Sequence, residues 1–201
     1  MPNGPTVKTP LYIFVLPFAL LGLLACGSAD PGTGGDGGNG GSPSDRRIFV
    51  TSAVQTAGLA GIAGADEICA IEAADANLQG EFKAWLSTTS SSVADRLSHD
   101  GGPFVRVDEV IVANDWADLI DGALLAPINL DANGQPRTGD VWTGTLGDGA
   151  SYVVSDCSGF TTANAPSAHA LCGSSTSATS TWTNNQPAGC ASTLRLYCIE
   201  Q

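Results

Sequence analysis

Basic residues are scarce in this chain. Lys and Arg together number 8 against 20 Asp and Glu, and Lys8 is the one basic residue that precedes Cys26. With histidine neutral, the chain after Cys26 carries seven positive and 20 negative charges, a net charge of −13. Nucleic acids and sulfated glycans are bound through clusters of Lys and Arg. The composition argues against nucleic acid as a partner, and we expect no binding to heparin.

Motifs of catalysis and metal binding are also missing. The chain has neither a Gly-x-Ser-x-Gly motif of serine hydrolases nor a Cys-x-x-Cys motif of zinc sites. His99 and Asp100 are interpreted as loop residues, because sequence neighbours rarely reach the geometry of a catalytic pair. The segment Asp131 to Gly134 fits a hairpin turn better than an EF-hand calcium loop. We therefore predict that the chain is not an enzyme and holds no cofactor or metal.

The first 25 residues predict an export signal. After a mildly positive start at Lys8, the segment Leu11–Leu24 is apolar and is interrupted by Pro17. A membrane-spanning helix needs about 20 apolar residues, so this segment is too short for a permanent anchor. It ends in Leu-Leu-Ala-Cys, which is similar to the bacterial lipobox. We predict a lipoprotein signal peptide over residues 1–25 and a lipidated Cys26 that holds the chain on a membrane.

Residues 26–45 are rich in glycine and have almost no apolar side chain. This composition predicts a flexible tether with an end-to-end distance of roughly 25 Å. In lipoproteins of double-membrane bacteria, an Asp directly after the lipidated cysteine favours the inner membrane, and here Gly27 follows instead. We expect the chain to be exported and anchored to the cell envelope, at the outer membrane or cell surface.

Residues 46–201 are expected to fold as one mixed α+β domain. Short runs of β-branched and aromatic residues predict strands in four segments: 46–51, 82–86, 141–143 and 194–199. Ser and Thr are frequent in residues 155–191, which we interpret as long polar loops.

A helix is predicted between the first two strands. Four residues at helical spacing share one face: Ala65, Ile68, Cys69 and Ala73. Asp66 and Glu67 are expected near its start, where the helix dipole favours acids, and Gly80 is expected to end it. Ser92 and Asp115 resemble N-cap residues and predict two further short helices.

Five cysteines remain after lipidation of Cys26: Cys69, Cys157, Cys172, Cys190 and Cys198. Export places them in an oxidising compartment, so we expect disulfides. The spacing alone leaves the pairing open, because any one of the five can be the unpaired residue.

The domain resembles the endostatin domain of collagens. The likeness rests on four features: the Gly-rich run 57–66, Cys69, the run 80–87 and the C-terminal run 189–200. Together with the lipobox and the low-complexity tether, these features are similar to the endostatin-like lipoproteins of bacteria. The resemblance covers about residues 47–201. It implies a C-type-lectin-like fold with a twisted antiparallel sheet, flanking helices and long loops, closed by two nested disulfides.

The resemblance also implies which cysteines pair. By position, Cys69 on the first helix pairs with Cys198 on the last strand, and Cys157 pairs with Cys190. Cys172 has no counterpart, which leaves three alternatives: a buried thiol, a dimerising thiol or a competitor for the inner bridge.

The function that the resemblance implies is surface binding. Bacterial endostatin-like lipoproteins resemble adhesins, so we expect a non-catalytic module that binds extracellular matrix or other surface proteins, or a neutral glycan. The segment with Trp182, Asn184 and Asn185 is similar to the Trp-Asn-Asp segment of calcium-binding lectins, but its acid is missing. We interpret Trp182 as a core residue and these three residues as a candidate ligand loop without metal. A calcium-dependent carbohydrate-binding lectin and a structural envelope lipoprotein remain the alternatives.

Overall fold

The described part of the chain opens with a strand that lies in the middle of a sheet. The computed structural model describes residues 45–201; Cys26, the predicted signal peptide and most of the predicted tether lie outside them. β1 (Arg46–Val50) completely buries three consecutive apolar side chains of the kind that favour extended backbone. It pairs antiparallel with the last strand, β8 (Arg195–Glu200), so both ends of the described chain meet in the sheet.

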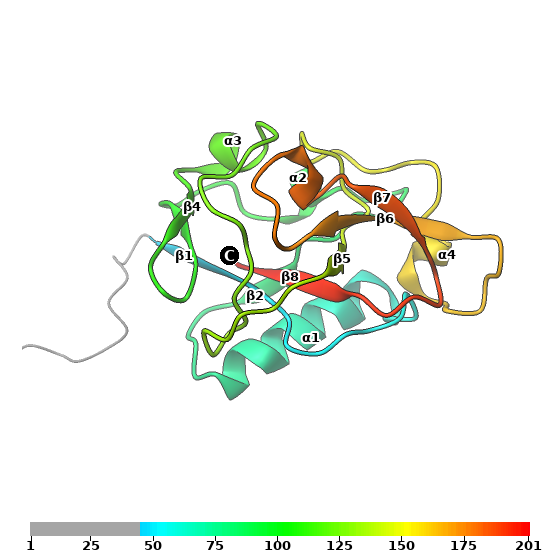
Figure 1. Ribbon diagram of the computed structural model, residues 1–201, viewed down its shortest axis with the longest axis horizontal. Coiled ribbons are helices and arrows are strands. Elements are labelled where there is room, and N and C mark those ends of the chain that lie inside the picture. Colours follow the sequence, from blue (N-terminus) through cyan, green and yellow to red (C-terminus); the bar gives the residue numbers. More distant parts are fainter. Residues whose placement is uncertain (1–44) are drawn as a thin grey trace, which may run out of the picture. The chain divides into compact units, whose positions relative to one another are not determined.

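Within residues 45–201, eight strands form one sheet with the order β4-β3-β1-β8-β5-β6-β7, and β2 pairs with β8 beside this path (Figure 1). The remaining strands are β2 (Phe82–Ala84), β3 (Phe104–Val105), β4 (Ile111–Ala113), β5 (Asp140–Trp142), β6 (His169–Ser174) and β7 (Gln186–Gly189). The pairs β1–β3 and β5–β8 are parallel, and the other pairs are antiparallel. The predicted mixed α+β class is confirmed, but the sheet is not the purely antiparallel one that the resemblance implies, because two of its strand pairs are parallel.

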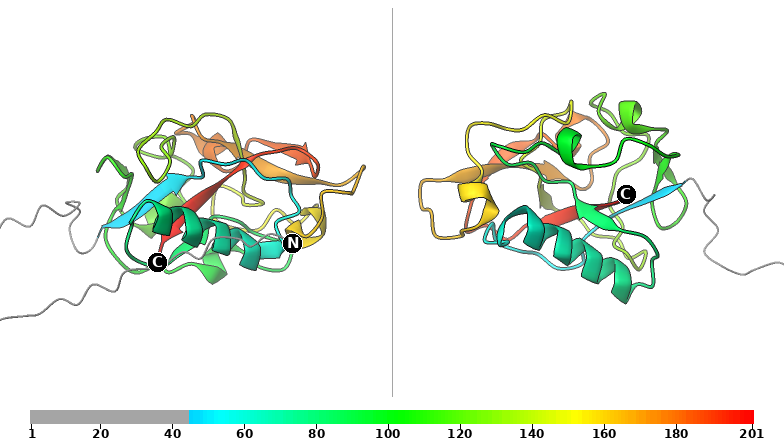
Figure 2. Two further views of the ribbon diagram at one scale, coloured as in Figure 1. Left: turned by 90° about the horizontal axis from the view of Figure 1, so that it is seen from below. Right: turned by 180° about the vertical axis from the view of Figure 1, so that it is seen from behind.

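α1 (Gly61–Asp75) is the one long helix of the described chain, and it packs against β2 and β8 (Figure 2). The predicted apolar face is confirmed, because Ala65, Cys69 and Ala73 are its buried residues. The predicted ends are wrong: the helix has no acid in its first turn and stops before Gly80. Gly80 instead has a φ of 109° in the connection to β2, where an added Cβ would lie 2.5 Å from the Glu200 carboxylate. Among the described residues, no helix has the length and apolar character needed to cross a membrane.

The two short helices predicted from their caps are present. The Ser92 side chain accepts the Asp95 N–H at the start of α2 (Val93–Arg96), and Asp115 accepts the Asp118 N–H at the start of α3 (Trp116–Leu119). The interpretation of residues 155–191 as long polar loops is wrong in part, since this segment also forms several elements: α4 (Cys157–Phe160), β6, η1 (Ser180–Trp182) and β7.

The central strands bury side chains on both faces of the sheet. Phe49 of β1 and Leu196 of β8 belong to a core cluster that includes α1, Trp142 and Phe160. Ile48 and Val50 of β1 and Tyr197 of β8 belong to a second cluster with Trp85 and Trp182. This alternation is the period of two that an extended strand imposes.

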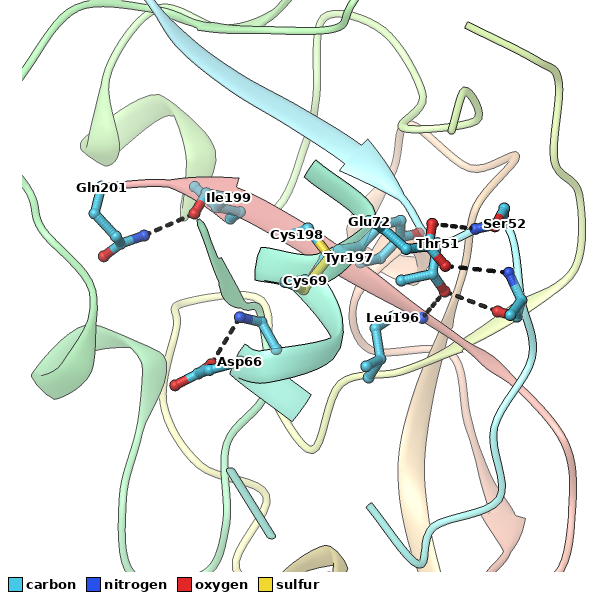
Figure 3. Close-up of a disulfide and its surroundings, with 12 residues drawn as sticks. Thr51, Ser52, Asp66, Cys69, Glu72, Leu196, Tyr197, Cys198, Ile199 and Gln201 are labelled. Atoms are coloured by element: carbon cyan, nitrogen blue, oxygen red, sulfur yellow. Dashed lines mark hydrogen bonds between the residues drawn. A yellow bond between two sulfur atoms is a disulfide. The ribbon is translucent and has the colours of Figure 1, made fainter. Parts of the chain in front are cut away.

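The described chain contains two disulfides, and they join the pairs that the resemblance implies. Cys69 of α1 is bonded to Cys198 of β8 across 129 residues (Figure 3). Cys157 of α4 is bonded to Cys190, directly after β7, across 33 residues. In the chain-entropy model, closing the longer loop contributes about 5 kcal/mol to stability. Cys172 is a free, buried thiol.

Candidate functional site

The most distinctive surface feature is a long stretch without charge. No Asp, Glu, Lys or Arg occurs between Asp156 and Arg195, although the domain before this stretch is rich in acids. The stretch supplies α4, β6, η1 and β7, which lie together at one side of the sheet (Figure 1). The lack of charge is visible in the sequence, but the interpretation of this segment as polar loops did not use it.

The β6–β7 loop, which we define as residues 175–185, presents hydroxyl and amide groups to solvent. Nine of its eleven residues are Ser, Thr or Asn. Those with exposed side chains are Thr176, Thr179, Ser180, Asn184 and Asn185. Three hydroxyls form a closed group, since Ser177 Oγ lies 3.1 Å from Thr179 Oγ1 and 2.7 Å from Thr181 Oγ1, and the two threonine oxygens are 3.1 Å apart.

Backbone bonds hold this loop in one conformation. Ser175 is buried, its N–H donates to Gly139 O at 3.0 Å, and its hydroxyl donates to Arg137 O at 3.1 Å. The Leu124 N–H donates to Ala178 O at 2.8 Å, and the Asn185 N–H donates to Cys172 O at 2.9 Å. The loop is therefore tied to neighbouring segments along its whole length.

Trp182 anchors the same loop in the core. Its side chain is fully buried, with ring centroids 4.9 Å from Trp85 and 5.6 Å from Tyr197. The Tyr197 hydroxyl donates to Trp182 O at 3.1 Å. The prediction that Trp182 is a core residue is confirmed, because its indole is completely buried.

Thr183 connects the loop to a buried polar network. Its hydroxyl accepts the Trp85 Nε1–H at 2.8 Å and donates to Thr145 O at 3.2 Å, while its carbonyl accepts the Thr143 hydroxyl at 2.6 Å. Each of these buried groups has a partner, which makes the network rigid and specific. The residues of the candidate ligand loop therefore differ in burial. Trp182 and Thr183 are buried, whereas Asn184 and Asn185 are exposed.

α4, at the start of the uncharged stretch, has a strained backbone. Four consecutive residues have left-handed φ values: Cys157 at 52°, Ser158 at 59°, Gly159 at 69° and Phe160 at 59°. For residues other than glycine, this conformation costs roughly 1–2 kcal/mol each. The turn is held by the disulfide from Cys157 and by the complete burial of Phe160.

Asp156 caps this strained turn. Its carboxylate accepts the Gly159 N–H at 2.8 Å and both the N–H and the hydroxyl of Thr89 at 2.9 Å. Burial raises the pKa of Asp156, but the hydrogen bonds from Thr89 and Gly159 outweigh that effect and leave the pKa below its usual value. The carboxylate is therefore ionised at neutral pH and ties α4 to the segment after β2.

Six of the seven basic side chains of residues 45–201 are engaged in the structure of the domain itself. Four of them form ion pairs: Lys83 with Glu81, Arg96 with Asp66, Arg106 with Asp108 and Arg137 with Asp131. Arg46 donates to Ser98 O at 2.8 Å and lies over the Phe104 ring, and Arg195 donates to Thr51 O at 2.9 Å. These contacts leave few positive groups to bind a polyanion.

The acids and histidines do not gather into a metal site. In residues 45–201, no group of three or more His, Cys, Asp or Glu side chains could hold a metal ion. Asp115 and Asp118 each accept a backbone N–H in or next to α3, and Asp121 accepts the Ala123 N–H. The exposed His99 ring stacks on Trp116 at 4.1 Å.

Three alternatives were expected for Cys172: a buried thiol, a dimerising thiol or a competitor for the inner bridge. In the structure it is a buried thiol. Its Sγ donates to Gln186 O at 2.9 Å, between β6 and β7. Burial, with a smaller contribution from the charge of Asp140, raises its pKa to about 11. The thiol is therefore protonated at neutral pH and is a poor nucleophile.

Comparison with known proteins provides no family for this chain. It matches no protein-family model, and a search of curated proteins finds no similar sequence.

Proposed function

We propose that this chain is a lipid-anchored, non-catalytic binding module, and that the β6–β7 loop is its ligand-binding surface. The ligand is an extracellular matrix or other surface protein, or a neutral glycan. One observation carries this proposal: a rigid, uncharged surface of hydroxyl and amide groups is presented by a domain that is otherwise strongly acidic.

Binding at this loop would cost little free energy in desolvation and in ordering of the loop. Hydroxyl and amide groups both donate and accept hydrogen bonds, so they match neutral polar ligands. No charge has to lose its hydration at the loop, which avoids the largest desolvation cost in an interface. Because Ser175, Trp182 and Thr183 already fix the loop, binding would order few additional groups.

The membrane anchor belongs to the same proposal. The lipobox ending at Cys26 and the Gly-rich tether support an exported chain that is anchored to the outer membrane or cell surface. The free tether would let the domain reach ligands away from the membrane.

The C-type-lectin-like, endostatin-like assignment is also proposed. It is supported by the sequence resemblance, by the disulfide from the first helix to the last strand, and by the inner disulfide nested within it. The pairing of β1 with β8 brings the two ends of the domain together.

An array of purified matrix proteins and of neutral and sulfated glycans tests the proposed function. The full chain in detergent should bind at least one protein or neutral glycan, and binding of a neutral glycan should change little with salt because the ligand carries no charge. Binding to nothing on the array, or to sulfated glycans alone, would contradict the proposal.

A further inference from the structure

Val153 and Val154 are the most exposed large apolar side chains of the described domain, at 71% and 67%. They occupy a turn, a position where Gly, Asn, Asp, Ser and Pro predominate. Single exposed apolar residues are common on protein surfaces. Two adjacent aliphatic residues at a turn are different, because neither contributes to the core and neither suits the turn.

The stem of this turn is fixed on both sides. The Tyr152 N–H donates to Gly144 O at 2.8 Å before the valines. After them, the Ser155 hydroxyl accepts the His169 N–H at 3.4 Å, and Asp156 forms a bridge to Ala170 of β6. The valines are thus presented by a fixed loop that adjoins the uncharged stretch.

The strained turn of α4 follows directly. Left-handed backbone at Cys157, Ser158 and Phe160 is unfavourable and persists because the Cys157–Cys190 disulfide and the Asp156 cap impose it. Strain of this kind is concentrated in proteins at places where a surface is held ready for a ligand. In this domain, the strained turn of α4 fixes the position of the turn that carries Val153 and Val154.

We infer that the Val153–Val154 turn is the apolar anchor of a surface that binds a protein, one that offers an apolar pocket with an uncharged or basic rim. The inference rests on the proposed function and narrows its ligand to the protein class. Valine side chains have no polar atom and cannot satisfy the hydroxyls of a glycan. The net charge of the domain favours a basic partner and disfavours a second copy of this acidic chain.

A random peptide library displayed on phage tests the inference with a defined probe. The full chain, immobilised in detergent, should enrich peptides that combine apolar residues with Lys or Arg. A synthetic peptide from that selection should bind the Val153→Asn/Val154→Asn variant about tenfold more weakly than the wild type, since two apolar contacts are lost and no charge is added.

Val54→Asn is the control, because Val54 is an exposed valine (46%) elsewhere on the domain. It should bind the peptide like the wild type, and both variants should keep about the wild-type melting temperature because none of the three valines belongs to the core. The inference is overturned when no peptide is enriched, or when enriched peptides bind the double valine variant unchanged. If an array ligand depends on Asn184 and Asn185 but not on the valines, the proposed function stands and this inference fails.

Discussion

At the scale of single residues, one glycine determines how the β6–β7 loop is seated. An added Cβ at Gly173 of β6 would lie 1.8 Å from Trp182 O, closer than any real contact. We predict that Gly173→Ala lowers the free energy of unfolding by about 3 kcal/mol, because η1 must move away from the strand. Gly189→Ala is the control, since nothing lies within 4 Å of its Cβ position. Equal losses in urea unfolding for the two variants would contradict this packing.

Asp156 provides a second prediction at this scale. Asp156→Asn should lower the free energy of unfolding at pH 7 by about 1–2 kcal/mol, because a charged cap and its hydrogen bonds are weakened. The folded-state pKa lies below the unfolded value, so this contribution is complete above the unfolded pKa of about 3.9 and is lost as the pH falls through the folded value.

Urea unfolding at pH 7 and near pH 3 measures this effect. The difference between the wild type and the Asp156→Asn variant should shrink at the lower pH. A difference of the same size at both pH values would show that the Asp156 charge does not support α4.

At the scale of elements, the inner disulfide and α4 act together. We predict that the Cys157→Ala/Cys190→Ala variant loses about 4 kcal/mol of stability, the chain-entropy value for a loop of 33 residues. Hydrogen exchange should accelerate in residues 155–170, where the strained turn is released, and remain slow in β1 and β8. Cys172→Ala is the control and should leave both disulfides and this exchange pattern intact. Uniformly faster exchange throughout the domain would contradict a local role for the inner bridge.

The elements that the sequence predicts are those with a local signal. Apolar periodicity predicts α1, and the caps Ser92 and Asp115 predict α2 and α3. The sequence does not predict β6 and β7, because most of their residues are small or polar. β6 is buried between β5 and β7, whereas β7 is an exposed edge strand that is held by its pairing with β6. α4 could not be predicted, since its left-handed backbone contradicts the propensities of Ser158 and Phe160 and depends on a bond to the distant Cys190.

The candidate site was predictable in part for the same reason. Trp182 could be placed in the core because large aromatic residues in folded domains are mostly buried. Trp182 is buried while Asn184 and Asn185 are exposed, and this difference depends on the network around Thr183. The network joins segments that are far apart in the sequence, so the sequence alone does not predict it. The disulfide pairing follows from resemblance, because cysteine spacing does not define it.

At the scale of the whole molecule, the excess of acidic over basic residues disfavours the binding of polyanions. With four basic side chains in ion pairs and Arg46 and Arg195 bonded to carbonyls, we predict no retention on heparin at physiological salt. Heparin chromatography measures this, with a basic protein of similar size as the positive control. Elution well above physiological salt would show that the fold presents a basic surface despite these contacts.

The uncharged surface of the β6–β7 loop is the proposed ligand-binding surface of the whole molecule. The most direct measurement compares the affinity of one array ligand for the full-length wild type and for the Asn184→Glu/Asn185→Glu variant. Two exposed side chains change, and the new charges would have to be desolvated on binding, so we predict a loss of about tenfold or more. Ala70→Glu/Ala74→Glu adds the same charge at exposed positions of α1 and should bind like the wild type. Unchanged affinity in the asparagine variant, or an equal loss in the α1 variant, would contradict the assignment of this surface.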